Sequence, residues 1–102
     1  MALGKANGFA ADTSDDAGAF TAANLSRYRT VVFNNTGGEV LDAGQRSAFQ
    51  NFIRAGGGYT GFHSACVTGF TWPWYGDLIG GGRFLKLFAI QKAAVVVVDA
   101  RH

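Results

Sequence analysis

Residues 30–63, TVVFNNTGGEVLDAGQRSAFQNFIRAGGGYTGFH, decide the fold. The stretch begins with a β-branched and aromatic run, 30–35, that lacks the polar and apolar alternation of a half-exposed strand. Such a run predicts a strand buried on both faces, as in a parallel sheet. A second strand is predicted over 59–63, directly after a glycine triplet. With a helical pattern between the two strands, the stretch predicts one right-handed βαβ unit.

The segment between the two strands carries the start and stop signals of a helix. Asp42 can cap its N-terminus, and Gln45 three residues later completes a capping-box pattern. Apolar side chains recur at helical spacing on one face, at Ala48, Phe49, Phe52 and Ile53. The triplet 56–58 predicts the end of the helix, with Gly56 in the left-handed C-terminal position.

Shorter patterns predict the remaining elements. Residues 9–13 indicate a short strand and 20–25 a brief helix. The motif WPWYG at 72–76 predicts an interruption of any helix, followed by a helical turn over 77–79. The last predicted strand is 93–99, whose valines form another run typical of a strand buried on both faces.

Composition bounds the class of protein. The chain has 102 residues, 48% of them hydrophobic and 16% charged, which indicates one folded domain rather than disorder. A net charge of +2 without a cluster of Lys and Arg excludes a nucleic-acid footprint. The longest apolar run is far shorter than the roughly 20 residues of a membrane span, so no membrane partner is expected. One cysteine excludes an internal disulfide.

Polar residues follow both strands of the predicted unit, at the edge where parallel sheets bind ligands. Asn35 and Thr36 come after the first strand, and His63 and Ser64 after the second. Gly61 and the small residues beyond it suit a sharp strand-to-helix turn that exposes the side chain at its elbow. A neutral His63 there could act as a general base or metal ligand. The alternative is a histidine that only hydrogen-bonds a neighbouring loop.

An ordered set of motifs over nearly the whole chain resembles the ThuA-like family, named for trehalose utilisation. The motifs are VFNNTGG at 32–38, Gln45 with Phe49, AGGGYTGFHSA at 55–65, Thr68, WPWYG at 72–76, LIG at 78–80 and IQKA at 90–93. The resemblance implies an α/β fold, a three-layer α/β/α flavodoxin-like sandwich with a parallel sheet, of the class I glutamine amidotransferase-like superfamily. It also implies a partial domain over 1–102, truncated at both ends relative to the family, whose related domains occur in bacterial proteins.

The resemblance implies a catalytic role for His63 in a pocket for a small carbohydrate. The substrate-binding residues that it implies are Asn35, Thr36, Ser64, Thr68, Trp72, Trp74 and Tyr75. Aromatic faces suit the C–H faces of a sugar, but the two tryptophans fit equally well as core anchors around Pro73. We expect no cofactor and no metal, because no spacing of His, Cys and Asp resembles a zinc signature.

The chain departs from the family's pattern at residues that matter for chemistry. Val67 stands where the family usually has Asp, and Leu87 where it has a second histidine. In the related amidotransferases the elbow carries a cysteine nucleophile; here it carries His63, so that chemistry is not implied. Cys66 lies three residues further on, either as a nucleophile beside the imidazole or as a small buried side chain.

Three functions therefore stay open. The first is a protein of trehalose or disaccharide (keto-sugar) utilisation that binds a small carbohydrate around His63, with enzymatic activity undecided. The second is a non-catalytic carbohydrate-binding or interaction module, and the third is a degenerate fragment without independent activity. A homo-oligomer is an open alternative. A cytoplasmic location is favoured, with a secreted parent protein as the alternative.

Overall fold

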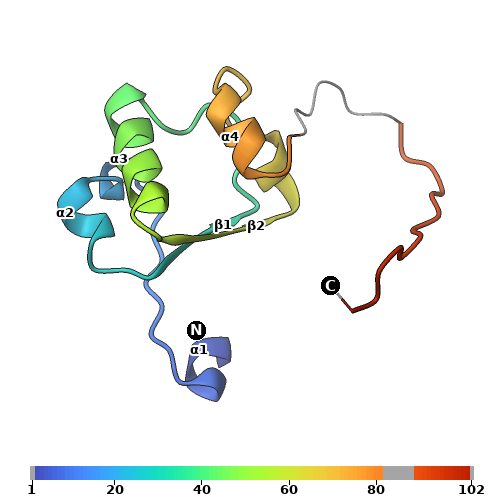
Figure 1. Ribbon diagram of the computed structural model, residues 1–102, viewed down its shortest axis with the longest axis horizontal. Helices are drawn as coiled ribbons and strands as arrows, with labels where there is room; N and C mark the ends of the chain where they lie inside the picture. Colours follow the sequence, from blue (N-terminus) through green and yellow to red (C-terminus); the bar gives the residue numbers. More distant parts are fainter. Residues whose placement is uncertain (1, 82–88, 102) are drawn as a thin grey trace.

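The computed structural model describes residues 2–81 and 89–101 (Figure 1). Its helices and strands, in chain order, are α1 (Ala2–Asn7), the 3-10 helix η1 (Ala17–Ala19), α2 (Ala22–Leu25), β1 (Thr30–Asn34), α3 (Ala43–Arg54), β2 (Gly58–Phe62), the 3-10 helix η2 (His63–Val67) and α4 (Pro73–Leu78). Within the described ranges no helix is long and apolar enough to cross a membrane.

The predicted strand–helix–strand unit is confirmed. β1 and β2 form a parallel two-stranded sheet whose register runs from Thr30 opposite Gly58 to Asn34 opposite Phe62. Together with the helices, this sheet makes the described structure a small α/β fold. The three-layer flavodoxin-like sandwich stays a prediction, because α2, α3 and α4 all lie on the same side of the sheet in Figure 1.

The helix α3 begins and ends where its sequence signals predict. The Asp42 side chain accepts a hydrogen bond from the Gln45 amide at 2.8 Å, and the Gln45 side chain accepts one from the Asp42 amide at 2.8 Å. This reciprocal capping box satisfies two amides that the first turn leaves without helical partners. After the helix, Gly56 adopts the predicted left-handed backbone, with φ +95°.

The core is an aromatic cluster between the sheet and α3 and α4. Phe49 of α3 is fully buried and stacks on Phe33 of β1 with 5.7 Å between ring centroids. Tyr75 of α4, 1% exposed, stacks on the other rings from the opposite side of the cluster. Full burial of one such side chain is worth about 1.5–3 kcal/mol, so these rings dominate the stability of the unit.

One prediction for the sheet is wrong: β1 is not buried on both faces. Val32 is 51% exposed and Phe62, on the same face of β2, is 55% exposed, whereas Phe33 is buried. The helices of the described chain cover only the face that carries Phe33, and α1 stands apart in Figure 1. The opposite face of the sheet therefore leaves the apolar side chains of Val32 and Phe62 open.

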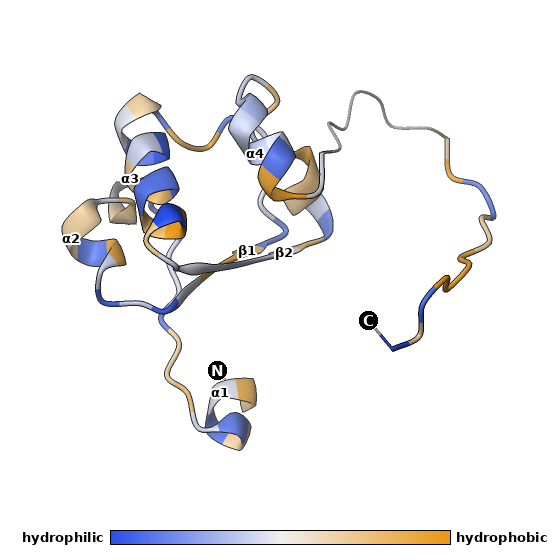
Figure 2. Ribbon diagram, viewed as in Figure 1, coloured by the Kyte–Doolittle hydropathy of each residue, from blue (hydrophilic) through white to orange (hydrophobic). Residues whose placement is uncertain are grey.

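Two predicted strands are also absent from the described residues. Neither 9–13 nor 93–99 is a strand, and the valines at 95–98 are 71–95% exposed. Figure 2 shows this apolar run in the extended tail, away from the sheet. Strand formation needs a hydrogen-bonded neighbour, and neither segment pairs with β1 or β2.

The motif WPWYG does not interrupt a helix; it starts one. Pro73 occupies the first position of α4, where its missing N–H costs nothing because that amide has no helical partner. The helix continues through Trp74 and Tyr75 to Leu78. The brief helix predicted over 20–25 is confirmed as α2, which begins after the Thr21 cap.

Candidate functional site

The sheet places Asn35 and His63 side by side at the carboxyl ends of β1 and β2. Because Asn34 lies opposite Phe62, the next residue of each strand emerges at the same edge. The Asn35 amide donates to the Phe62 carbonyl at 3.1 Å. Both Asn35 and His63 have left-handed backbone, with φ +58° and +52°. A non-glycine residue in this conformation is uncommon. Two of them side by side at the ends of neighbouring strands indicate a site held in a defined geometry.

The side chains of His63, Asn35 and Ser64 form a closed triangle of polar atoms. His63 Nδ1 lies 2.7 Å from Asn35 Oδ1, and Ser64 Oγ lies 2.9 Å from each of those two atoms. A carbonyl oxygen can only accept, so the hydrogen-bond pattern assigns the proton of a neutral His63 to Nδ1. Asn35 therefore positions the imidazole and selects its tautomer.

This assignment leaves His63 Nε2 with a lone pair. Nε2 has no hydrogen-bond partner among the described residues, and the side chain is exposed. An unprotonated imidazole nitrogen can accept a hydrogen bond from a hydroxyl group, remove a proton from it, or bind a metal. The elbow predicted from the small residues around His63 thus presents one reactive nitrogen to solvent.

Thr36 and Thr68, two further predicted site residues, meet behind this triangle. The Thr68 hydroxyl donates to the Thr36 carbonyl at 2.6 Å, and Thr68 is buried. A β-bridge between Gly38 and Thr68 extends the contact, with the Gly38 amide donating to Val67 at 3.0 Å. These bonds tie the loop after β1 to the end of η2, so the two threonines support the site from below.

Tyr75 holds η2 from the core side. Its hydroxyl donates to the Ala65 carbonyl at 2.8 Å and makes a second, short hydrogen bond with the Tyr59 hydroxyl. Burial raises the pKa of both tyrosines, because a phenolate in the apolar cluster would lose its hydration. Gly61 makes this close approach possible: a Cβ there would lie 2.7 Å from the Tyr59 hydroxyl and 2.9 Å from Ala65 Cβ.

The three aromatic residues of the WPWYG motif lie in or against the core. Trp72 is buried and stacks on Tyr75 at 5.7 Å, and Trp74 packs edge-on against Phe49 at 5.9 Å. The sequence is compatible with two roles for the tryptophans, core packing and contact with a sugar, and the structure shows the packing role. Trp74 is the partly buried residue of the three, and Trp72 and Tyr75 are buried. Contact of these rings with a sugar stays a prediction.

Arg46 fixes the loop that precedes α3 to the start of α4. Its guanidinium lies 5.3 Å from the Trp72 ring centroid and pairs with Glu39, whose other carboxylate oxygen accepts from the Thr71 amide at 2.8 Å. The Thr71 amide and the nearby guanidinium hold the pKa of Glu39 below its usual range. No sequence pattern signals this link, since neither Glu39 nor Thr71 belongs to a recognisable motif.

Cys66 and Val67, two residues that bear on alternative chemistry, lie in η2 together with His63. Cys66 is exposed rather than buried, one 3-10 turn beyond His63, and Val67 packs near Gly37. Within 2–81 and 89–101 no three His, Cys, Asp or Glu side chains cluster in a way that could hold a metal ion. Leu87, where the family has its second histidine, and His102 lie outside the described residues.

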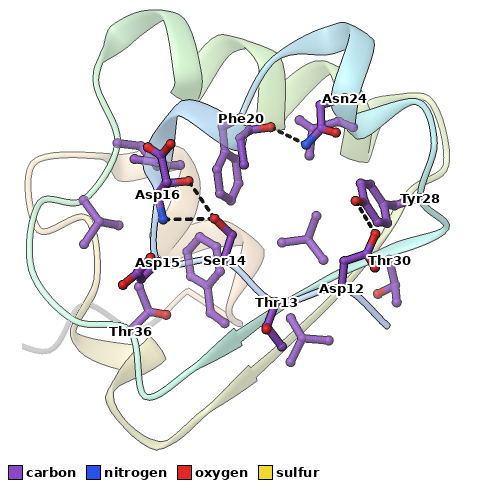
Figure 3. Close-up of a pocket in the computed structure, with 18 residues that line it drawn as sticks. Asp12, Thr13, Ser14, Asp15, Asp16, Phe20, Asn24, Tyr28, Thr30 and Thr36 are labelled. Atoms are coloured by element: carbon purple, nitrogen blue, oxygen red, sulfur yellow. Dashed lines mark hydrogen bonds between the residues drawn. The ribbon is translucent and has the colours of Figure 1, made fainter. Parts of the chain in front are cut away.

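A cavity of about 360 Å³ lies away from the elbow, beside β1 (Figure 3). Thr36 is the one predicted site residue among its walls. The other walls come from the segment 12–20, from α2 and its C-terminal turn, from β1 and from the loop before α3. No sequence pattern signals it, because its walls meet only in the folded chain. The cavity and the His63 triangle are therefore two separate features of the molecule.

Together, the parallel sheet and the strand-tip histidine define an α/β protein with a candidate ligand site at the carboxyl ends of its strands. The chain belongs to the ThuA family, whose description is trehalose utilisation and whose match covers residues 1–102. Membership suggests a role in trehalose utilisation. No curated protein and no solved structure matches the chain.

Proposed function

We propose that this chain binds a small carbohydrate of trehalose or keto-sugar utilisation at the strand tips, with His63 Nε2 as the central hydrogen-bond acceptor. The observation that carries the proposal is the hydrogen-bonded triangle of His63, Asn35 and Ser64. It holds an exposed imidazole in one orientation and one tautomer. Sugars carry many hydroxyl groups, and an unprotonated ring nitrogen accepts hydrogen bonds from them.

The partner of His63 bears on whether the site also catalyses. A base that removes a proton becomes an imidazolium, which a carboxylate partner stabilises. Here the partner of Nδ1 is the neutral amide of Asn35, and Val67 stands where the family usually has an acid. This arrangement favours binding over proton transfer. A non-catalytic carbohydrate-binding module is thus the alternative that a specific contact supports, and general-base catalysis is the stronger claim to be tested.

Calorimetric titration of the whole chain with trehalose and its keto derivatives tests the proposal, with analysis of the sugar afterwards for product. We expect saturable binding that His63→Ala weakens by about tenfold or more, the loss of a well-placed hydrogen bond in the site. Ser47→Ala, an exposed change on α3, is the matched control and should bind as the parent does. Binding without product identifies a binding module, and product that His63→Ala abolishes identifies an enzyme. Equal affinity in the parent and His63→Ala would contradict the proposal.

A further inference from the structure

One edge of β1 is open. Within the described chain β1 pairs only with β2. The Asn35 amide donates to Phe62, and the Arg29 carbonyl accepts from Gly58, so odd-numbered positions face β2. Because the hydrogen-bonding direction of a strand alternates with a period of two, positions 30, 32 and 34 direct their backbone groups away from β2. No hydrogen bond joins these groups to any other described residue.

The cavity beside β1 follows this open edge. Its walls include Val31 and Phe33, from one face of the strand, and also Thr30 and Val32, from the other, so it opens along the edge rather than over a face. The second wall is the segment 12–16, which runs alongside β1: Figure 3 places Asp12 beside Thr30, and Asp15 beside Thr36. We call this cavity the edge slot. A strand added to the open edge of β1 would lie between these two walls.

The same chain carries a strand-forming segment without a sheet. The valine run, 95–98, has the sequence of a strand buried on both faces, yet these four residues are 71–95% exposed. The slot and the tail also differ in the sign of their charge, because Lys92, Asp99 and Arg101 give residues 92–101 a net charge of +1. Asp12, Asp15 and Asp16 line the edge slot, with no Lys or Arg among the lining residues. Lys92 precedes the valine run, and Arg101 follows it, beside its own partner Asp99.

We propose that residues 93–99 of a second copy of this chain occupy the edge slot and add a strand to β1. Figure 1 shows the tail that carries the valine run on the opposite side of the molecule from α2 and the segment before it. A partner copy reaches the slot without threading the chain past its own sheet. Exchange of the segment in both directions closes a two-fold dimer, in which the partner supplies the hydrogen bonds that positions 30, 32 and 34 lack.

Sedimentation equilibrium of the whole chain over a range of concentrations tests the proposal. We expect a species of twice the chain mass. Val96→Lys and Val97→Lys together place a charge on each face of the added strand, because neighbouring side chains of a strand point to opposite faces. One of the two lysines then lies on the face that the helices cover, so this double variant should raise the dimer dissociation constant by about tenfold or more. Val96, Val97 and the control position Ile90 are exposed in the same tail and do not contribute to the core, so the double variant and Ile90→Lys keep the fold of the monomer. Ile90→Lys should dimerise as the parent does.

Cross-linking identifies the occupant of the slot. In a Cys66→Ser background with oxidised glutathione as the oxidant, one preparation carries Thr13→Cys and another Val97→Cys. A disulfide between the two that forms well above the level seen with Ile90→Cys in place of Val97→Cys places the tail of one copy in the slot of another. Cross-linking on mixing, together with a dimer that the double lysine variant dissociates, supports the proposal. A monomer at every concentration overturns it, as does a dimer that the double lysine variant leaves intact. A cross-link that forms only when both cysteines are on one chain assigns the slot to the chain's own tail and also overturns it.

Discussion

His63 Nδ1 lies 2.7 Å from Asn35 Oδ1, and both residues have left-handed backbone at the tips of neighbouring parallel strands. The contact joins residues that are far apart in the chain and adjacent in the sheet register. It converts a flexible surface histidine into one with a fixed ring orientation and a defined protonated nitrogen. Each half of the contact, the side-chain bond and the backbone conformation, leads to a measurable consequence.

The tautomer of His63 is the first consequence. In the parent chain we expect the neutral imidazole to carry its proton on Nδ1, as read from the nitrogen chemical shifts of the ring by NMR. Asn35→Gly removes the acceptor while tolerating positive φ, so the ring should shift toward the Nε2-protonated form. Asn34→Ala, one residue earlier on an exposed strand position, should change nothing. An Nε2 proton in the parent would refute the assignment.

The left-handed backbone of His63 gives the second consequence. At φ +52° a Cβ is strained, so His63→Gly should be more stable than His63→Ala by about 0.5–1 kcal/mol, after allowance for the greater freedom of unfolded glycine. Ser47 on α3 provides the opposite sign: there the glycine variant should be less stable than the alanine variant by about 1 kcal/mol. Urea unfolding of the four variants measures both differences. The same sign at the two positions would show that His63 is unstrained.

Tyr75→Phe tests the support beneath the elbow. The change leaves the Ala65 carbonyl and the Tyr59 hydroxyl without their shared buried partner, at an expected cost of about 1–3 kcal/mol in the free energy of unfolding. Tyr28→Phe is the matched control, because its hydroxyl bonds Asp12 at the exposed surface and should cost well under about 1 kcal/mol. Equal losses for the two variants would mean that the contact with Ala65 contributes little.

Alkaline titration should reveal the shielded phenols. The pKa is raised for all three tyrosines: by burial first for Tyr59 and Tyr75, and by the hydrogen bond to Asp12 first for Tyr28. A folded pKa above the unfolded value of about 10 means that this stability is complete below pH 10 and is lost as pH rises further. The tyrosinate absorbance of Tyr59 and Tyr75 should therefore lag behind that of the unfolded chain and rise together with unfolding, whereas the exposed Tyr28 can ionise in the folded chain. Ordinary titration of all three in the folded chain would contradict this.

The strand–helix–strand unit is predictable because its signals are local. Asp42 and Gln45 cap the helix with their own side chains, and Gly56 supplies the backbone conformation that ends it. The position of the elbow at His63 follows from the same reading. The role of Gly61 is less visible in the sequence: it gives room to Tyr59 and Ala65, which only the folded chain brings together.

What fails to follow from the sequence depends on neighbours rather than on local preference. The valines at 95–98 favour a strand, but a strand also requires a partner, and none of the described segments provides one. The apolar run around Val32 likewise favours a strand covered on both faces, but no described segment covers the face of the sheet that carries Val32. The edge slot was missed because Asp12, Phe20, β1 and Leu41 are separated along the chain and meet only as its walls. The three-layer sandwich, the sugar contacts and the oligomeric state stay predictions.

The stacking of Tyr75 on Trp72 gives the protein an optical probe of its own. Both tryptophans of the chain pack in the cluster around Tyr75 and Phe49, and Tyr75 is bonded to the 3-10 helix that starts at His63. A ligand that shifts this helix changes the surroundings of the indole rings. Intrinsic tryptophan fluorescence therefore reports occupancy of the elbow without any label, and a screen of candidate sugars can be run on the unmodified chain.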